Sequence, residues 1–505
     1  MRSWIVAAAM TAAVTANAAP RTRVVDVPPH DTAARFHPDD GGPVRTIYLN
    51  PCTGGCTVTA LPTADFADDD ATADKTIVLQ PPGSYSLSEF AFGSASWASI
   101  VSCVQQVYSA YDVQVVDQRP ASGVYNETLV AGIPGEGNED RSTLGIAPVA
   151  TDCSPLSNEV AIVFANADPG PDHVTGVCWT VAQESAHIYG LDHEFEFVDA
   201  AAPTPPNSSQ LPSTCSDPMT YQTDCGGQKF FRDYGAKCGE FGPPEDNSPR
   251  ACRCGSLQNS HAVLMKVFGA GTPTWTAPTS AITRPATGDT IQDSSSVIVK
   301  ATAQRGIEHV ELVLNGAVWA DTLGDFSSQG LPGSDYSIAL PNDVPDGVID
   351  IVARAHDDLG GVTDSATVTV TKGAPCSDAS TCAAHQSCDG SGRCVYPTAT
   401  AKLGDGCSFD AECESSLCAQ GACTQNCDTL DSNSCPSDFT CKSPSTDSTA
   451  GSCEAGGAGG GCCSTGGSTG AGMSPLLALG VLGVISRRRR RRSRRCAPSA
   501  TRRSR

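Results

Sequence analysis

The sequence predicts a multidomain protein: an α+β domain, a β-sandwich, a disulfide-rich module and a short C-terminal transmembrane segment. Three observations predict this order. Strand and helix patterns alternate through residues 43–270, apolar and polar residues alternate through 280–372, and twelve cysteines crowd residues 376–453. A chain of 505 residues is also too long for one ordinary core. We therefore expect separate modules.

The N-terminus has the composition of a secretory signal. Arg2 precedes a short apolar run, and Ala16 and Ala18 form an A-x-A pattern. A buried N-terminal helix is the alternative, but the run ends in a processing-like site rather than a cap. Residues 1–18 are therefore expected to be a cleaved signal peptide and the protein to be exported. No pro-segment is apparent in the polar lead that follows, up to about residue 42.

Export would bring 25 cysteines into an oxidising compartment, where disulfides form. Ten cysteines lie between Cys52 and Cys254 and twelve between Cys376 and Cys453, both even counts, as closed sets require. The second group has too few apolar residues for a core, so disulfides must hold it as a stalk. A zinc cluster is the alternative, but no C-x-x-C pair occurs in that stalk.

The formal net charge of −22 combines two regions of opposite sign. Of the 33 basic residues, 11 lie in the last nineteen positions; without these and Arg2, 21 basic residues face 55 acidic ones, a balance of −34. Such an acidic body argues against nucleic acid as a partner. Nothing in the sequence indicates an oligomeric state.

The first domain begins with "TIYLNPCTGGCTV", which predicts a strand, a Gly-Gly turn between Cys52 and Cys56, and a returning strand. Apolar residues at helical spacing predict a helix over 95–111, and "VQVVD" follows as a strand. A further strand, "EVAIVFA" at 159–165, precedes the helix that carries "QESAHIYGLDH". This order is typical of α/β or α+β domains.

Residues 280–372 are expected to form a β-sandwich, because runs such as "SVIVKATA" and "DIVARAHD" alternate apolar and polar residues. The segment resembles the bacterial Ig-like domains through "IEHVELVLNG" and "DGVIDIVARAHDDLGG". His309 and His356 lie in its predicted strands and are expected to be surface or packing residues.

The stretch "QESAHIYGLDH" is the candidate site for chemistry. Gln183 and His187 stand at positions i and i+4 of a helix and share one face. Gly190 permits a sharp turn that returns His193 to the same point, where a metal could bind. Glu184 is placed to take a proton from a metal-bound water. The alternative is an ordinary buried helix end with two hydrogen-bonded histidines.

The same stretch resembles the long motif H-E-x-x-H-x-x-G-x-x-H of the metzincin zinc metallopeptidases, which belong to the zincins. The motif of that family is followed by a methionine-containing turn, and "CSDPMTY" supplies Met219 twenty-six residues after His193, with Tyr221 two places after it. The resemblance covers roughly residues 43–270. It further implies that "EVAIVFA" is the edge strand that pairs with an extended substrate.

The resemblance implies specific roles. His187 and His193 would be zinc ligands, Glu184 the general base, Met219 the floor of the site, and Tyr221 a ligand or a stabiliser of the oxyanion. Gln183 replaces the first histidine of the motif.

A glutamine carbonyl oxygen is a weaker zinc donor than an imidazole nitrogen. Three outcomes are open: Gln183 ligates with help from Tyr221, His173 takes its place, or no metal binds. The expected function is that of a zinc endopeptidase cleaving extended protein substrates. The alternative is an inactive pseudopeptidase that acts as a surface adhesion or peptide-binding protein.

Calcium is a further candidate cofactor, at the acidic stretches "GEGNED" and "ADFADDDATAD". The alternative is that these loops are merely solvated.

The C-terminal residues 456–495 contain a glycine-rich linker, a short apolar segment and an arginine block. This order resembles the MYXO-CTERM class of sorting tails, in which cysteine precedes the hydrophobic segment. It implies display at the cell surface or outer membrane, or later release, with Cys462 or Cys463 as the processing and anchoring position. A plain tail-anchored membrane protein is the alternative.

Overall fold

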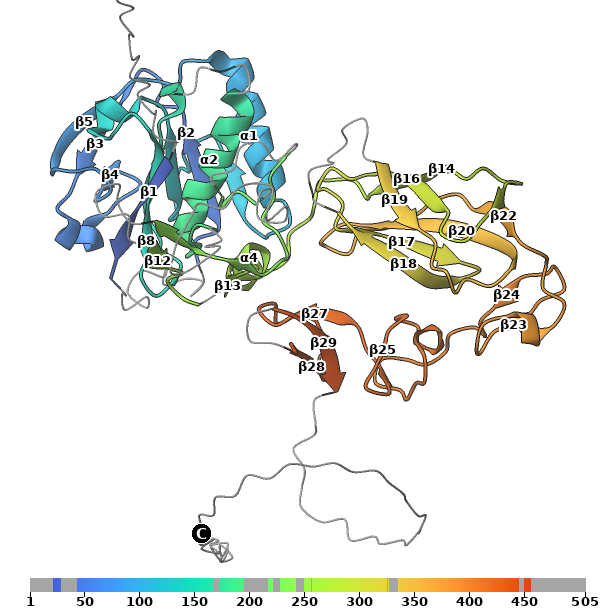
Figure 1. Cartoon of the computed structure of the whole chain (residues 1–505). Helices are drawn as coiled ribbons and strands as arrows, with labels where there is room; N and C mark the ends of the chain where they lie inside the picture. Colours follow the sequence, from blue (N-terminus) through green and yellow to red (C-terminus); the bar gives the residue numbers. More distant parts are fainter. Residues whose placement is uncertain are drawn as a thin grey trace, which may run out of the picture. The chain divides into compact units, whose positions relative to one another are not determined.

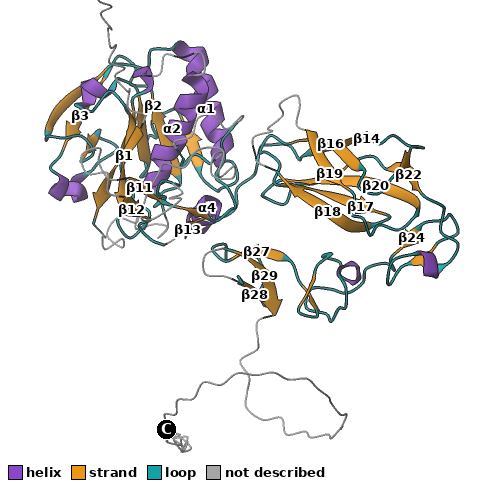
Figure 2. Cartoon of the chain, in the orientation of Figure 1, coloured by secondary structure: helices purple, strands orange, loops and turns teal. Residues whose placement is uncertain are grey.

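A computed structural model describes residues 21–28, 43–167, 170, 173–194, 217–220, 228–241, 249–255, 257–324, 326, 335–444 and 449–455 (Figure 1). Strands form most of the regular structure in these residues (Figure 2). No helix among them is long and apolar enough to cross a membrane. The expected signal peptide, Tyr221, and the tail with Cys462, Cys463 and the expected transmembrane segment lie outside the described residues.

The first domain is built on a mixed six-stranded sheet. Its strands, in spatial order, are β1 (Arg21–Val27), β8 (Thr143–Ala150), β9 (Val160–Val163), β7 (Asn126–Val130), β2 (Thr46–Asn50) and β6 (Gln114–Val116). From β9 to β6 neighbouring strands are parallel, whereas β8 is antiparallel to β9. Strand β1 pairs in parallel with β8 and forms the outer edge of the sheet.

Two helices, α1 (Gly93–Tyr108) and α2 (His173–Ile188), pack side by side on one face of this sheet (Figure 1). Successive strand residues point to opposite faces, so Leu49 joins the core beneath the helices and Tyr48 joins the core on the other face. A disulfide between Cys103 and Cys178 ties α1 to α2.

Shorter elements complete the domain. A small sheet contains β4 (Lys75–Thr76), β3 (Cys56–Ala60) and β5 (Gly83–Leu87). Two two-stranded sheets pair β10 (Ala236–Lys237) with β13 (Leu257–Gln258) and β11 (Gly239–Phe241) with β12 (Pro249–Ala251), and α4 spans Ser260–Phe268.

Two sequence expectations about these strands are wrong. The strand after the Gly-Gly turn, β3, pairs with β4 and β5 and does not return along β2. The stretch "EVAIVFA" contains β9, which lies between β7 and β8 and is not an edge strand. All four residues of β9 are buried, as expected for a strand covered on both faces.

A β-sandwich follows the first domain. One sheet contains β14 (Thr279–Arg284), β16 (Ser296–Thr302) and β19 (Asp335–Ala339), and the other contains β15 (Thr290–Ile291), β22 (Val368–Lys372), β20 (Gly347–His356), β17 (His309–Leu314) and β18 (Ala317–Leu323), with β21 (Val362–Asp364) pairing β20. Alternate residues of β20 are buried, so the alternation read from the sequence places one side of each strand in the core.

The cysteine-rich region has short strands. They are β23 (Ser387–Cys388), β24 (Cys394–Val395), β25 (Cys418–Ala419), β26 (Ala422–Cys423), β27 (Asn426–Asp428), β28 (Phe439–Lys442) and β29 (Ala450–Ala455). Its twelve cysteines form three successive four-cysteine modules, each joining its first cysteine to its third and its second to its fourth. The pairs are Cys376–Cys388, Cys382–Cys394, Cys407–Cys418, Cys413–Cys423, Cys427–Cys441 and Cys435–Cys453. The prediction that disulfides hold this region is confirmed.

Removal of the helix-to-helix disulfide should destabilise the first domain strongly. The Cys103–Cys178 bond spans 75 residues, whereas the Cys52–Cys56 bond spans four. In the chain-entropy model these loops correspond to about 4 and about 2 kcal/mol. The Cys103→Ala/Cys178→Ala variant should therefore lower the urea midpoint more than Cys52→Ala/Cys56→Ala does. Equal midpoints would contradict this reasoning.

Candidate metal centre

The end of helix α2 positions the candidate site. The Leu191 amide donates to the Ala186 carbonyl at 3.3 Å and the Gly190 amide donates to the His187 carbonyl at 2.9 Å, which is a Schellman termination. Gly190 has φ +90°, and a Cβ there would lie 2.2 Å from the carbonyl oxygen of Cys153. Only glycine fits this position, so the chain turns sharply and returns to the helix.

The turn brings His193 against His187. Their Nε2 atoms lie 3.0 Å apart, and both side chains are fully buried. The hydroxyl of Thr22 lies 3.0 Å from Nε2 of His193 and donates to Oε1 of Gln183 at 2.9 Å. The structure thus places His187, His193 and Gln183 in one buried row of contacts, with Thr22 of β1 between His193 and Gln183.

The tautomer of His187 follows from its second nitrogen. Its Nδ1 lies 2.8 Å from the Leu191 carbonyl, which can only accept, so Nδ1 carries the proton and the Nε2 lone pair faces His193. Burial, together with the neighbouring His193, holds the pKa of His187 well below its usual value. His187 is therefore neutral near pH 7, the form that binds a metal.

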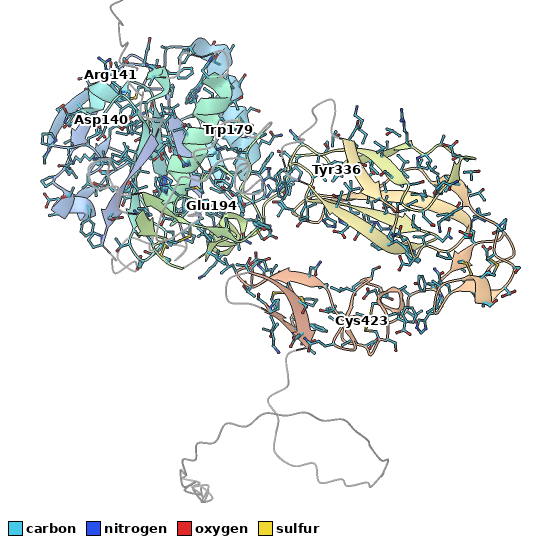
Figure 3. The ribbon with its side chains drawn as sticks, in the orientation of Figure 1. Asp140, Arg141, Trp179, Glu194, Tyr336 and Cys423 are labelled. Carbon is cyan, nitrogen blue, oxygen red and sulfur yellow. A yellow bond between two sulfur atoms is a disulfide. The ribbon has the colours of Figure 1, made fainter. Side chains whose placement is uncertain are left out.

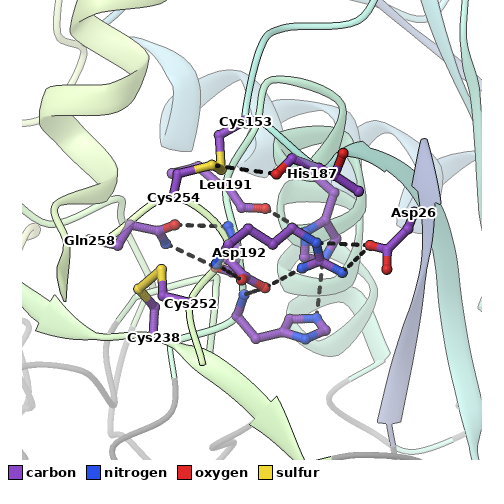
Figure 4. Close-up of polar contacts among 12 residues, drawn as sticks. Asp26, Cys153, His187, Leu191, Asp192, Cys238, Cys252, Cys254 and Gln258 are labelled. Atoms are coloured by element: carbon purple, nitrogen blue, oxygen red, sulfur yellow. Dashed lines mark hydrogen bonds and ion pairs between the residues drawn. A yellow bond between two sulfur atoms is a disulfide. The ribbon is translucent and has the colours of Figure 1, made fainter. Parts of the chain in front are cut away.

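The loop that carries His193 is fixed by Asp192. The Asp192 carboxylate accepts from the amides of His193 and Arg253, and the side chain of Gln258 bonds the Asp192 backbone on both sides, at 2.8 and 2.9 Å (Figure 4). The Arg253 guanidinium also pairs with Asp192. These supporting residues were not found in the sequence, because polar residues in irregular segments have no periodicity.

Arg253 is itself held on both sides. Its neighbours Cys252 and Cys254 form disulfides with Cys238 and Cys153 (Figure 4). Two covalent links therefore fix the backbone from which Arg253 reaches Asp192.

The methionine-containing turn lies beside Gln183. The Gln183 amide nitrogen donates to the carbonyl of Pro218 at 2.9 Å, which leaves Oε1 directed toward Thr22. Met219 is fully buried, and its carbonyl accepts from the Glu194 amide at 2.9 Å. Figure 3 shows Glu194 beyond the C-terminal end of α2, which carries Trp179. The turn is thus attached to both the helix and the His193 loop.

Asp217 closes this turn. Its carboxylate accepts from the amides of Met219 at 2.9 Å and Arg232 at 2.8 Å. Burial raises the pKa of Asp217 to about 6, although these two hydrogen bonds oppose the shift. Its interactions keep the backbone of the turn in place under the site.

Glu184 is fully buried between α2 and strand β8. A Cβ added to Gly145 of β8 would lie 2.6 Å from Cγ of Glu184, so the carboxylate-bearing side chain rests directly on the backbone of that strand.

His173 cannot replace Gln183, and that alternative is wrong. His173 is the first residue of α2, stacks on Phe92 and bonds Ser96 at 3.0 Å through Nε2. With a rise of 1.5 Å per residue, it lies about 21 Å along the helix from His187. Tyr221 lies outside the described residues.

The acidic stretches considered for calcium have protein partners. In "GEGNED", Glu136 accepts from Ser88 and Glu139 pairs with Arg23. In "ADFADDDATAD", Asp70 accepts from Thr72 and Asp74 pairs with Arg119.

The donor set at His187 fits a zinc ion. Two nitrogen ligands at the usual 2.0–2.1 Å in a tetrahedral site are about 3.3 Å apart, close to the 3.0 Å between the Nε2 atoms. Gln183 offers a neutral oxygen as the weaker third donor. His187, His193 and Gln183 are therefore the residues that could hold the metal.

Gly190→Ala should unfold or severely destabilise the first domain, because the new methyl group meets the Cys153 carbonyl and the left-handed φ is unfavourable. We expect a loss above about 3 kcal/mol in urea unfolding. Gly123 has the same φ of +90° with nothing within 4 Å. The matched Gly123→Ala variant should therefore lose only about 1 kcal/mol. Similar losses in both variants would contradict the importance of this contact.

Comparison with known proteins identifies one domain of the chain. No curated protein matches the chain. The fibronectin(III)-like modules of CbhA from Clostridium thermocellum are 14% identical with TM-score 0.15, over 19% of this chain and 94% of that one. A lytic polysaccharide monooxygenase from Jonesia denitrificans is 15% identical with TM-score 0.15, over 18% of this chain and 76% of that one. Likenesses at these TM-scores carry no argument. Residues 278–347 match the family model described as a bacterial Ig domain, so the chain contains a bacterial Ig-like domain.

Proposed function

We propose that the protein is an exported, surface-anchored zinc endopeptidase of the metzincin type that cleaves extended protein segments. One observation carries this proposal: buried contacts link Nε2 of His187 to Nε2 of His193, and the Thr22 hydroxyl links Nε2 of His193 to Oε1 of Gln183. The neutral state of His187 and the fit to zinc support it.

The residues have distinct roles in this proposal. His187 and His193 would hold the zinc with Gln183, and the ion when bound would polarise a water and the peptide carbonyl. Glu184 would accept the proton of that water and deliver it to the leaving nitrogen. Strand β8 would bind the substrate backbone by strand addition, which recognises an extended conformation. The Ig-like domain and the stalk would act as a spacer.

A second candidate is a peptide-binding or adhesion protein without catalysis. Two observations favour it: Gln183 stands in place of a histidine, and the Thr22 hydroxyl lies where the donors meet. The edge of β8 would then hold a peptide that is not cut.

The zinc content of the exported chain separates these candidates. After dialysis against buffer without zinc, elemental analysis should find about one zinc per chain fewer in His187→Ala than in the natural protein, and an unchanged content in Glu184→Gln. Glu184→Gln should lower hydrolysis of an unstructured protein at least about 100-fold, the usual contribution of a general base. His385→Ala, in the stalk, should change neither quantity.

The Gln183→His variant provides the converse test. If the natural protein lacks zinc and activity and this variant gains both, the second candidate is correct. Zinc in the natural protein without any Glu184-dependent hydrolysis would contradict the catalytic proposal.

A further inference from the structure

The edge of the central sheet next to the metal centre is occupied by the chain's own N-terminal strand. All seven residues of β1 pair in parallel with β8, from Arg21 opposite Thr143 to Val27 opposite Ala150. The other side of β8 pairs with β9. An external peptide therefore cannot add to β8 while β1 is present.

One residue of β1 reaches the candidate site. Thr22 lies opposite Gly145, the residue of β8 on which Glu184 rests. Its hydroxyl is 3.0 Å from Nε2 of His193 and donates to Oε1 of Gln183. The side chain is buried, so Thr22 occupies space beside His193 and Gln183 that solvent does not reach.

Further contacts fasten the rest of β1. Asp26 pairs with Arg253 at 2.7 Å, the same side chain that holds Asp192 beside His193 (Figure 4). Arg23 lies 3.3 Å from Glu139. Val27 is fully buried in the apolar cluster behind β8.

These contacts are all non-covalent. The sequence has no cysteine before Cys52, so no disulfide can tie β1 to the domain. Between Thr22 and Val27 the residues are exposed or only partly buried. Only hydrogen bonds, ion pairs and limited apolar contact hold the strand on β8.

We infer that β1 is an inhibitory segment that occupies the substrate-binding edge of β8 and leaves when an extended peptide takes its place. This inference rests on the proposed function for its inhibitory consequence. The occupied site accepts an extended chain segment with a small hydroxyl side chain at the metal centre, which Thr22 supplies in the resting protein.

The test severs β1 after the domain has folded. A recognition sequence for a specific protease is inserted between residues 29 and 42 of the full chain, and the cut protein is dialysed. The β1 fragment should be lost, and hydrolysis of an unstructured protein should rise at least ten-fold. A fluorescent peptide of sequence RTRVVDV should then bind, shown by anisotropy, and reverse the gain, whereas a scrambled peptide should do neither.

The binding readout separates the two proposals. If the peptide binds saturably but neither the cut nor the uncut chain hydrolyses protein, the peptidase proposal is wrong. The inference that β1 occupies a peptide-binding site then still holds. A fragment that stays bound through dialysis, with unchanged hydrolysis, or a cut chain that binds no peptide, overturns the inference.

If cutting unfolds the domain, Arg23→Glu should raise hydrolysis and peptide binding in the uncut chain, and Arg23→Glu/Glu139→Arg should restore both to the original level. No effect of Arg23→Glu would also overturn it.

A second, independent observation concerns the Ig-like domain. His309 of β17 and His356 of β20 are directly opposite in register, with their rings stacked 4.0 Å apart at 12°. Glu311 lies two residues along the same face, with Oε2 3.2 Å from Nε2 of His356 and Oε1 3.9 Å from Nε2 of His309. One ligand atom from each of the three side chains lies within 4.8 Å of the others.

The chemistry of this group suits a first-row divalent cation. Two imidazoles and a carboxylate are a donor set that zinc, nickel and copper prefer. The three side chains are 18–26% exposed, so an ion could enter from solvent. Arg354 is 3.6 Å from Glu311, but it also pairs with Asp364 at 2.8 Å, and Glu308 adds a negative charge beside His309.

We propose that His309, Glu311 and His356 form a surface site for a zinc-like cation. The sequence predicts surface or packing roles for these histidines, and this proposal adds a ligand role to them. In the full chain carrying His187→Ala/His193→Ala, titration with zinc should show one site, lost in His356→Ala and weakened at least ten-fold in Glu311→Gln. His385→Ala should leave binding unchanged. The proposal is wrong if the His187→Ala/His193→Ala chain shows no saturable zinc binding, or if His356→Ala does not change that binding. The three side chains would then form only a cross-strand ion pair.

Discussion

The candidate site depends on the close approach of the Gly190 backbone to the carbonyl of Cys153. Because no side chain fits between them, helix α2 must end where it does and the chain must reverse at once. That reversal places the two histidine rings against each other. Cys153 is also bonded to Cys254, next to Arg253, which holds the loop after the turn. One backbone contact therefore couples the helix end, the His193 loop and the segment that supports both.

The local part of this site could be predicted from the sequence. Spacing of i, i+4 on a helix brings Gln183 beside His187 whatever the rest of the chain does, and a glycine after the last turn is a sufficient signal for the reversal. The helix α1 and the strands β2, β6 and β9 were likewise found from periodicity. In the β-sandwich, the alternation of apolar and polar residues predicts both the strands and the residues that face the core.

The non-local part could not be predicted in this way. Thr22 and His193 are in contact although 171 residues separate them in the sequence. Strands pair at a sheet edge through backbone groups that every residue type carries, so the side chains do not reveal which strands will pair. "RTRVVDV" contains β-branched residues, which favour a strand, but its residues do not indicate that the strand pairs with β8. The error over "EVAIVFA" was avoidable: a continuous apolar run favours a central strand covered on both faces, and an edge strand usually alternates. That His309 faces His356 could be predicted only from the register of β17 against β20, which the sequence does not specify.

The interlaced disulfides of residues 376–453 have a consequence for how this region withstands backbone cleavage. In each module the first cysteine bonds the third and the second bonds the fourth, so a single backbone cut anywhere between the first and last cysteine leaves both halves joined. Only cuts in the connections between modules, at 395–406 and 424–426, separate one module from the next. The disulfide-rich region therefore remains one covalently continuous piece after most single backbone cuts, whatever makes them.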